Sequence, residues 1–424
     1  MTSSLLRIGR GPGGLRAAAL RLPGRATAAL AAGVPLGARD DPFGQEGLAH
    51  LLEHALFRGG PDGDAEDLAR ALARAGADVN AITSHDDLRL DAFVLPDGIS
   101  ETARILGGIF HNARLADADV EHERQVVLQE LAEHPDEGGV GTLLDAACWG
   151  AHPLARPVAG TAQSLAKIPP ASLRHAAQSH LGPATSCAVV VGDADPNAML
   201  HALIEGFGGP SRARRPERRA PRFQGGLEWQ ETDKDDPVAD VALAYAAPVA
   251  GDPSADAARL AAALLGGGPT GTLFLALRER HGIAYGVEAR LEQGEDWGRL
   301  CIDLRLPADR LDDGLALLSK SLDAPPEADR IAEIRRIEIL QTATSLDSPD
   351  GAAHALLSDL LNGRPLQAPG ERLERLRRTS ETAVAEALQR ILAGPPALAI
   401  VGPAPRRRTL TRTRFADLAR RLPR

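Results

Sequence analysis

The 424-residue chain contains little lysine and few aromatic side chains. Only three lysines stand among its 48 basic residues, and Phe, Trp and Tyr together make up 3% of the sequence. Because 44% of the residues are nevertheless hydrophobic, we expect a core built mainly from Ala, Leu and Val. No run of roughly 18 apolar residues occurs, which excludes a membrane-spanning helix. The length predicts two to three globular domains.

Cysteine and net positive charge are also scarce. Cys148, Cys187 and Cys301 are odd in number, far apart and without a C-x-x-C pair. This excludes a disulfide framework and a thiolate zinc site, and it indicates a reducing compartment, so we expect a cytoplasmic protein. A formal net charge of −9 argues against a nucleic-acid partner, because phosphate neutralisation needs a basic face.

The first forty residues carry several arginines and no acid before Asp40, as in a mitochondrial presequence. Arginines interrupt each apolar run, however, and residues 14–36 alternate around a turn at Pro23-Gly24. We therefore expect a first hairpin of the mature fold and keep a targeting segment as the alternative.

Two halves with the same order of patterns follow one another along the chain. Each has an alternating strand, a turn with Asp and Pro, a helical run and, near its end, a short apolar strand closed by Gly. A breaker-rich, arginine-rich segment lies between the halves. We predict a tandem α+β duplication with a first domain at 1–207, a linker at 208–226 and a second domain at 227–424. Helices are expected at residues 47–57, 65–75, 99–110, 119–133, 170–180, 255–265, 308–322, 328–344 and 379–392.

The strongest chemical signal is His50-Leu-Leu-Glu53-His54 within the helical run 47–57. Residues three and four apart share one face of a helix, so both imidazoles and the carboxylate point the same way. Two neutral imidazoles at this spacing can hold zinc, and a carboxylate beside them can act on water. The alternative is a solvated charge pair with incidental histidines. The apolar flanks argue against that alternative, because they would bury unpaired polar groups.

A catalytic zinc needs a third protein ligand, and the helix expected at 119–133 offers carboxylates. Glu123 and Glu130 are seven residues apart and face the same way, with Val126 and Val127 between them. We expect Glu121 and Glu133 of the same helix to be surface charges. His122 is a further possible ligand, but it is offset from the face of the two central glutamates.

H-x-x-E-H followed about 76 residues later by E-x₆-E resembles the inverzincin peptidases of the pitrilysin/insulinase family. This family includes the mitochondrial processing peptidases and the pyrroloquinoline-quinone biosynthesis peptidases. The resemblance implies that His50, His54 and Glu130 hold one zinc ion per chain and that Glu53 is the general base. Glu123 matches the family's additional acid, which would orient a ligating histidine.

The resemblance extends over essentially the whole chain and implies a substrate-binding edge strand. Residues 76–83 resemble the family's G-x-x-x-N-A-x-T strand, and residues 152–161 resemble its H-P…I-x-G-T segment. An extended peptide would add as a strand beside Asn80, Ala81, Ile82 and Thr83.

The second half has no H-x-x-E-H but resembles the family's L-R…G-x-x-Y stretch. Arg278 would pin a peptide carbonyl or carboxylate, and Tyr285 would donate to a developing oxyanion. The alternative is that both are structural residues at a helix end. The glycines at 266–268 lack the Gly-Lys-Ser/Thr ending of a phosphate loop, so we do not expect a nucleotide site.

In fold, the resemblance implies two tandem homologous α/β-sandwich domains, each an antiparallel sheet flanked by helices, that pair into a clamshell dimer. The partner would be a second copy of this chain or a homologous subunit. In function, it implies a zinc endopeptidase that cuts extended or small unfolded peptides, such as a precursor peptide. The alternatives are a catalytically inactive scaffold or partner subunit, and a zinc-storage or sensing module.

Overall fold

The computed structural model describes residues 5–133, 139–233 and 235–403. These residues form two compact units. The first takes the described residues within 1–134, 156–219 and 342–372, and the second takes those within 135–155, 220–341 and 373–424. Each unit therefore includes one short stretch from the other half of the chain. In the described residues, no helix is long and apolar enough to cross a membrane.

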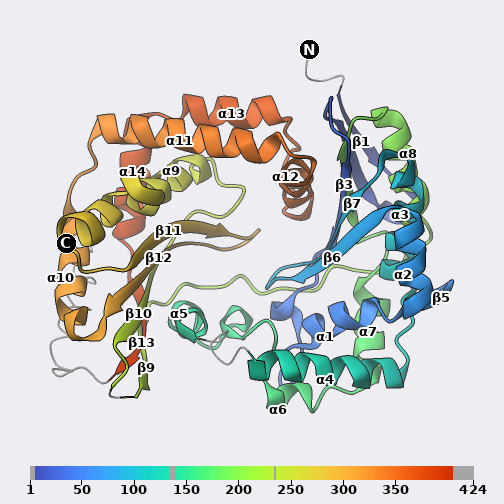
Figure 1. Cartoon of the computed structure of the whole chain (residues 1–424), viewed down its shortest axis with the longest axis horizontal. Coiled ribbons are helices and arrows are strands. Elements are labelled where there is room, and N and C mark those ends of the chain that lie inside the picture. The colour runs from blue at the N-terminus through green and yellow to red at the C-terminus, as the bar shows by residue number, and fades with distance from the viewer. Residues whose placement is uncertain (1–4, 134–138, 234, 404–424) are drawn as a thin grey trace. The chain divides into compact units, whose positions relative to one another are not determined.

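The first unit is built on a six-stranded sheet in the order β1-β2-β8-β3-β7-β6 (Figure 1). Its pairs are antiparallel except for the parallel pair β2–β8. The strands are β1 (Leu6–Arg10), β2 (Arg16–Arg21), β3 (Ala28–Val34), β6 (Ala77–Thr83), β7 (Leu88–Val94) and β8 (Cys187–Gly192), and a small ribbon adds β4 (Gly59–Gly60) and β5 (Gly63–Asp64). The helices are α1 (Leu48–Leu56), α2 (Ala65–Arg74), α3 (Ile99–Asn112), α4 (Asp117–Glu133), α6 (Ala162–Leu165), α7 (Pro170–His180), α8 (Pro196–Phe207) and α12 (Pro349–Leu361).

The expected hairpin over residues 14–36 is wrong in its pairing. Both strands form, but β2 and β3 are not neighbours, because β8 lies between them. All six residues of β8 are buried. A fully buried strand needs partners on both edges for its backbone groups, and β2 and β3 supply them, while β1 closes the outer edge of β2.

The two faces of this sheet are covered by different helices (Figure 1). Leu30, Leu90 and Val190 face the main core, to which α3 and α8 also contribute. Helix α12 packs against the other face, on β3 and β8. Gly33 of β3 makes this close approach possible, since a Cβ there would lie 3.1 Å from the Leu361 side chain.

An ion pair fixes α12 to this sheet. His354 Nε2 lies 2.8 Å from Asp91 Oδ1 on β7, and its other ring nitrogen lies 3.7 Å from Asp350. The contact with Asp91 raises the pKa of His354 above its ordinary value. The folded state therefore binds this proton more tightly than the unfolded chain does.

The second unit repeats the topology of the first. Its five-stranded sheet has the order β11-β12-β10-β13-β9, antiparallel except for the parallel pair β13–β9. This is the order and direction of β6-β7-β3-β8-β2, which confirms the predicted tandem α+β fold. The strands are β9 (Gly226–Thr232), β10 (Val238–Ala246), β11 (Gly286–Gln293), β12 (Gly298–Pro307) and β13 (Pro396–Pro403).

Helices cover both faces of the second sheet as well. Leu243 and Ile302 face the core shared with α9 and α14, whereas Ala242 and Cys301 face α5. The helices are α5 (Gly139–Trp149), α9 (Ala255–Gly266), the π-helical turn η8 (Phe274–Arg280), α10 (Leu311–Asp323), α11 (Ala328–Leu346), α13 (Pro369–Arg378) and α14 (Glu381–Leu392). Two of the boundaries between the units fall within helices, one in α11 and one in α13.

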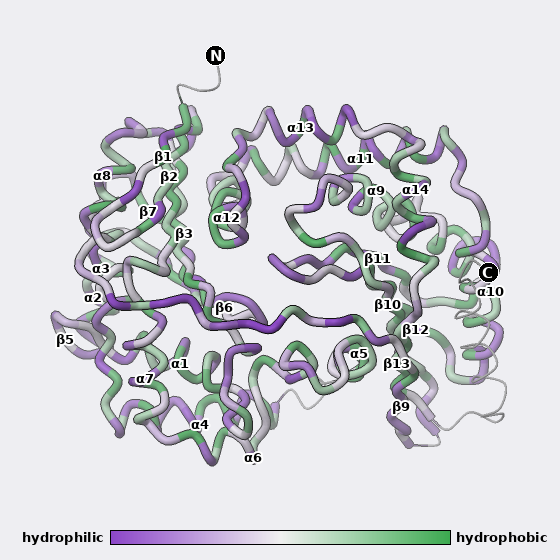
Figure 2. The backbone as a smooth tube through the Cα atoms, turned by 180° about the vertical axis from the view of Figure 1, so that it is seen from behind, coloured by the Kyte–Doolittle hydropathy of each residue, from purple (hydrophilic) through white to green (hydrophobic). Residues whose placement is uncertain are grey.

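The nine expected helices all form, with ends that differ by up to three residues. The sequence prediction did not include α5, α6, α8, α12 or α13. Figure 2 shows one reason why the prediction missed α13. Its tube is mostly hydrophilic, in contrast to the hydrophobic β3, so it has no broad apolar face that would indicate a helix.

We expect His354→Gln to lower the free energy of unfolding near pH 6 and to change it little near pH 9. A histidine with a raised folded pKa stabilises fully below its unfolded pKa of about 6.5, and this stabilisation is lost as the pH rises through the folded value. Urea unfolding at both pH values measures the difference. His201→Gln on the exposed surface of α8 is the control. Equal losses at both pH values would show that the Asp91 pair does not contribute.

Candidate metal centre

Helix α1 is held at its beginning by a buried carboxylate. Asp41 accepts hydrogen bonds from the backbone N–H groups of Gly47, Leu48 and Ala49 at 2.8–3.1 Å. Three of the four N–H groups that a helix start leaves unpaired are thereby satisfied. Gly47 has φ +92°, and a Cβ there would lie 2.6 Å from the Ala159 carbonyl oxygen, so the segment resembling I-x-G-T packs directly against this start.

The two faces of α1 differ sharply in burial. Leu48, Leu51, Leu52, Ala55 and Leu56 are at most 2% exposed and belong to the main core. The remaining face carries the half-buried side chains of the H-x-x-E-H motif. The motif therefore presents both imidazoles and one carboxylate on the side of the helix that the core leaves free.

Helix α4 packs against α1 and carries the second part of the motif. Glu123 and Val127 face inward, at 8% and 0% exposure, whereas Val126 is 39% exposed. Of the two valines between Glu123 and Glu130, only Val127 lies on the inward side. Arg124, a buried residue that the sequence pattern did not single out, donates to the carbonyl groups of Leu165 and Ile168 and so ties α4 to the loop before α7.

His50, His54 and Glu130 come together on this surface. One ligand atom from each lies within 4.8 Å of the others. Glu130 Oε2 lies 3.6 Å from His54 Nε2, and the rings of the two histidines are 4.8 Å apart. Within the described part of the chain, this is the one group of three His, Cys, Asp or Glu side chains placed to hold a metal ion.

The donor set fits zinc. Two imidazole nitrogens and one carboxylate oxygen are a ligand set found in catalytic zinc sites, which leave one position open. Glu130 Oε2 is buried and accepts no hydrogen bond from any described residue. A buried carboxylate oxygen without a donor is costly, and a cation bound there would remove that cost.

Glu53 lies beside these three residues and is held by the neighbouring strand. The Thr83 hydroxyl, at the end of β6, donates to Glu53 Oε2 at 2.5 Å. Burial raises the pKa of Glu53, and the hydrogen bond from Thr83 partly offsets this. A raised pKa brings a carboxylate closer to the range in which it can both take and return a proton. Thr83 also belongs to the expected substrate strand. Its contact with Glu53 is a second role, which the sequence pattern did not indicate.

Glu123 lies behind His54 on the side away from Glu130. Its Oε2 lies 3.3 Å from His54 Nδ1, and its Oε1 lies 3.5 Å from Arg58 Nε. With the ring proton assigned to Nδ1, the imidazole donates to the carboxylate and leaves Nε2 free for a metal. Arg58 was missed from the sequence because it follows the motif by four residues and belongs to no metal-ligand pattern.

Strand β6 lies at the edge of its sheet. The exposed side chains of Asn80 and Ile82 alternate with the half-buried Ala81 and Thr83. An edge strand offers unpaired backbone groups to which an extended peptide can add. The expected substrate strand therefore has the accessibility that its assigned role requires.

Arg278 and Tyr285 belong to the second unit. Arg278 is exposed on η8, with its guanidinium 5.0 Å from the centre of the Phe274 ring. Tyr285 is 57% exposed just before β11. Both side chains are accessible, as a role in contacting substrate demands.

Residues 16–162 match the family described as Insulinase (Peptidase family M16), and residues 167–324 match the Peptidase M16 inactive domain. An uncharacterized zinc protease of Mycobacterium tuberculosis is 31% identical over 319 residues, which is 74% of this chain and 73% of that protein. The chain belongs to the M16 peptidase family. It matches one M16 peptidase domain followed by one M16 inactive domain, which is a two-domain architecture of that family.

Further relatives and solved structures agree with this assignment. An uncharacterized zinc protease of Streptomyces coelicolor is 26% identical over 92% of this chain and 88% of its own length. A probable mitochondrial-processing peptidase subunit beta of Schizosaccharomyces pombe is 27% identical over 54% of this chain and 52% of its own length. The fold matches a protease from Helicobacter pylori, with a TM-score of 0.84 at 17% identity, over 94% of this chain and 99% of that one.

The second unit contains the counterpart of the zinc-site surface, without its chemistry. Helix α9 and strand β11 occupy the places that α1 and β6 have in the first unit, and residues of α11 line the same pocket as both. Placing Leu48 on Ala257 puts each buried position of α1 on a buried position of α9, which buries Ala262, Ala263 and Gly266 in addition. Positions 50, 53 and 54 then correspond to Arg259, Ala262 and Ala263.

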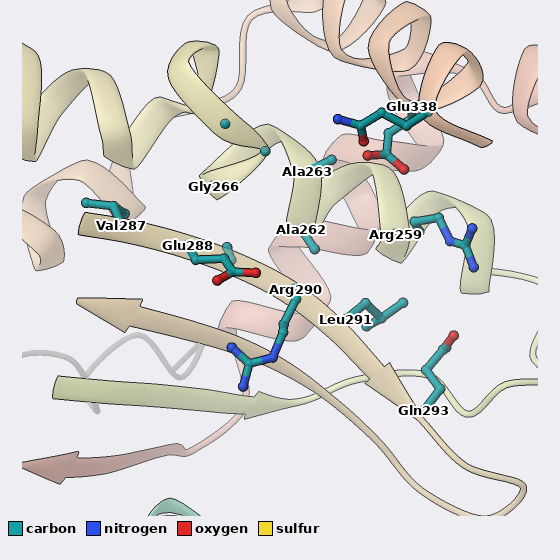
Figure 3. Close-up of a pocket in the computed structure, with 14 residues that line it drawn as sticks. Arg259, Ala262, Ala263, Gly266, Val287, Glu288, Arg290, Leu291, Gln293 and Glu338 are labelled. Atoms are coloured by element: carbon teal, nitrogen blue, oxygen red, sulfur yellow. The ribbon is translucent and has the colours of Figure 1, made fainter. Parts of the chain in front are cut away.

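The counterpart surface encloses a pocket of about 550 Å³ between α9, α11 and β11 (Figure 3). On α11, Arg335 corresponds to Arg124, because it donates to the Thr379 carbonyl as Arg124 donates to the Ile168 carbonyl. With this alignment, position 130 corresponds to Gln341. None of the four motif side chains is retained at these positions, so the counterpart surface lacks this donor set.

We expect Glu130→Gln to weaken zinc binding by at least about 100-fold, because an amide oxygen is a poorer zinc ligand than a carboxylate. Competition with a chromophoric chelator measures the affinity. Glu133→Gln, on the exposed end of the same helix, is the matched control and should bind zinc as the wild type does. Unchanged affinity in Glu130→Gln would remove Glu130 from the ligand set.

Proposed function

We propose that this M16 family member is a zinc endopeptidase that hydrolyses extended or unfolded peptides, with His50, His54 and Glu130 holding one zinc ion per chain. The observation that carries the proposal is the convergence of these three donors beside Glu53, whose pKa is raised by burial. The names of its relatives as zinc proteases support the same metal and reaction.

When bound, zinc would act as a Lewis acid, which polarises a carbonyl and lowers the pKa of water. Glu53 accepts the proton of the water that attacks the scissile carbonyl carbon, and it then delivers this proton to the leaving amine. Thr83 holds the carboxylate in place through its hydroxyl. Glu123 holds the imidazole of His54.

The substrate would lie extended along β6, pairing its backbone with residues 80–83. Backbone pairing gives affinity with limited side-chain preference, which suits an enzyme for unfolded segments. Arg278 and Tyr285 would contact the same peptide, the first at a carbonyl or carboxylate and the second at the developing oxyanion. Processing of a small precursor peptide is one reaction that fits.

A catalytically inactive partner or scaffold is the alternative. One chain of Complex III2 from Candida albicans has the same fold, with a TM-score of 0.83 at 16% identity over 97% of this chain and 99% of that one. The complete donor set and the adjacent Glu53 favour the peptidase, because a scaffold has no use for a general base.

We expect Glu53→Gln to bind zinc with wild-type affinity and to lose at least about 10²-fold in kcat, because the amide cannot accept the proton. Zinc content and cleavage of a quenched-fluorescence peptide library measure the two effects. Glu66→Gln, on the exposed face of α2, is the control and should retain activity. Cleavage at the wild-type rate by Glu53→Gln would exclude it as the base.

We also propose that the active form is a dimer in which Arg278 and Tyr285 act at the zinc site of the partner chain. One relative is named as a subunit of the mitochondrial processing peptidase, which is consistent with a paired assembly. This chain carries both the donor set and the Arg/Tyr element, so two copies would form two complete sites.

Mixing two inactive variants tests this arrangement. In random dimers of Glu53→Gln and Tyr285→Phe chains, half are mixed, and each mixed dimer has one intact site, so about a quarter of wild-type activity should return. The assay is peptide cleavage after co-refolding or co-expression. No recovery in mixed dimers, verified by differently tagged chains, would show that the tyrosine does not act across the dimer.

A further inference from the structure

We propose that Arg58 is a positioning residue of the metal centre that acts on His54 through the carboxylate of Glu123. The proposal rests on the zinc site of the proposed function, but it concerns metal binding rather than peptide cleavage.

Arg58 stands directly after the last turn of α1. Its backbone N–H donates to the Ala55 carbonyl at 3.2 Å, which fixes the start of its side chain relative to the helix that carries His54. The side chain is 32% exposed, whereas its Nε atom is buried, makes no hydrogen bond to a described residue, and forms an ion pair with Glu123 Oε1 at 3.5 Å.

Glu123 divides its two oxygens between two partners. Oε2 lies at His54 Nδ1 and Oε1 at Arg58 Nε, and the residue is only 8% exposed. A carboxylate with a single partner can rotate about its last torsion, whereas a hydrogen bond at one oxygen and an ion pair at the other favour one orientation of the group. The orientation of the carboxylate in turn sets the ring plane of His54 and the direction of its Nε2.

Charge gives Arg58 a second effect. Glu53, Glu123 and Glu130 bring three carboxylates to a small region, and their mutual repulsion grows as water is excluded. With a divalent ion bound, the three carboxylates, the ion and the guanidinium sum to zero, whereas without Arg58 one negative charge remains. The guanidinium therefore lets the carboxylate of Glu123 stay close to His54 when Glu130 binds the ion.

Three variants separate this role from general stability. Arg58→Met keeps the length of the side chain without its charge, and Arg58→Lys restores a cation. Arg114→Met is the matched control, because Arg114 pairs with Asp119 at 3.1 Å near the start of α4 and does not pair with Glu123. Arg58→Gln is the substitute if Arg58→Met fails to fold, as judged by the thermal melting of the metal-free proteins.

We expect Arg58→Met to weaken zinc binding by about 10- to 100-fold and to shift the visible absorption bands of the cobalt-substituted protein, because both report the geometry of the ligands. Arg58→Lys should recover affinity to within about threefold of the wild type, and Arg114→Met should match the wild type in both measurements. In the peptidase assay, Arg58→Met should lower kcat and leave KM unchanged.

Wild-type zinc affinity and an unchanged cobalt spectrum in Arg58→Met would overturn the proposal. An Arg58→Lys variant as weak as Arg58→Met would overturn it too, since a cation at this position would then not be what holds Glu123. Zinc affinity and the cobalt spectrum need no substrate. A wild-type protein that binds zinc but cuts no peptide would therefore contradict the proposed function and leave this test intact.

Discussion

The candidate metal centre depends on how helix α1 divides its surface between the core and the chemistry. Its leucines are buried in the main core, and Asp41 satisfies its first three backbone N–H groups. A helix held at one end and along one side has little freedom to turn. The free face can therefore present His50, Glu53 and His54 in one fixed arrangement, which a metal site requires.

The elements around α1 each contribute one constraint to this arrangement. Helix α4 brings Glu130 to the imidazoles and Glu123 to the far side of His54, and the buried Arg124 fixes α4 in place. Strand β6 ends at Thr83, whose hydroxyl holds Glu53. The edge proposed to receive an extended peptide thus belongs to the same strand that positions the proposed base, so substrate binding and proton transfer would both depend on β6.

The sequence predicted those parts of the centre whose spacing follows the periodicity of an α-helix. Residues three, four and seven apart on a helix share a face, so spacing alone places each motif on one side of its helix. The inward position of Val127 and the exposure of Val126 depend on how α4 packs, and no spacing specifies that. Arg58 lies outside the motif altogether, and its contact with Glu123 depends on the path of the chain after α1 ends.

In the fold, local patterns were also predicted better than long-range pairings. The repeated order of elements correctly indicated two similar α+β domains. The insertion of β8 between β2 and β3 could not be read from neighbouring residues, because β8 lies more than 150 positions further along the chain. The packing of α12, from late in the chain, onto the first sheet depends on His354 and Asp91 meeting in space, which also has no local signal.

The central claim is that one zinc ion is bound by side chains from two helices of the first unit. The most direct measurement is an anomalous difference map at the zinc edge from crystals of the zinc-loaded protein. We expect a single peak per chain, at about 2.0–2.2 Å from one imidazole nitrogen of His50, one of His54 and a carboxylate oxygen of Glu130. A peak ligated by other residues, or none at this position in protein that contains one equivalent of zinc, would contradict it.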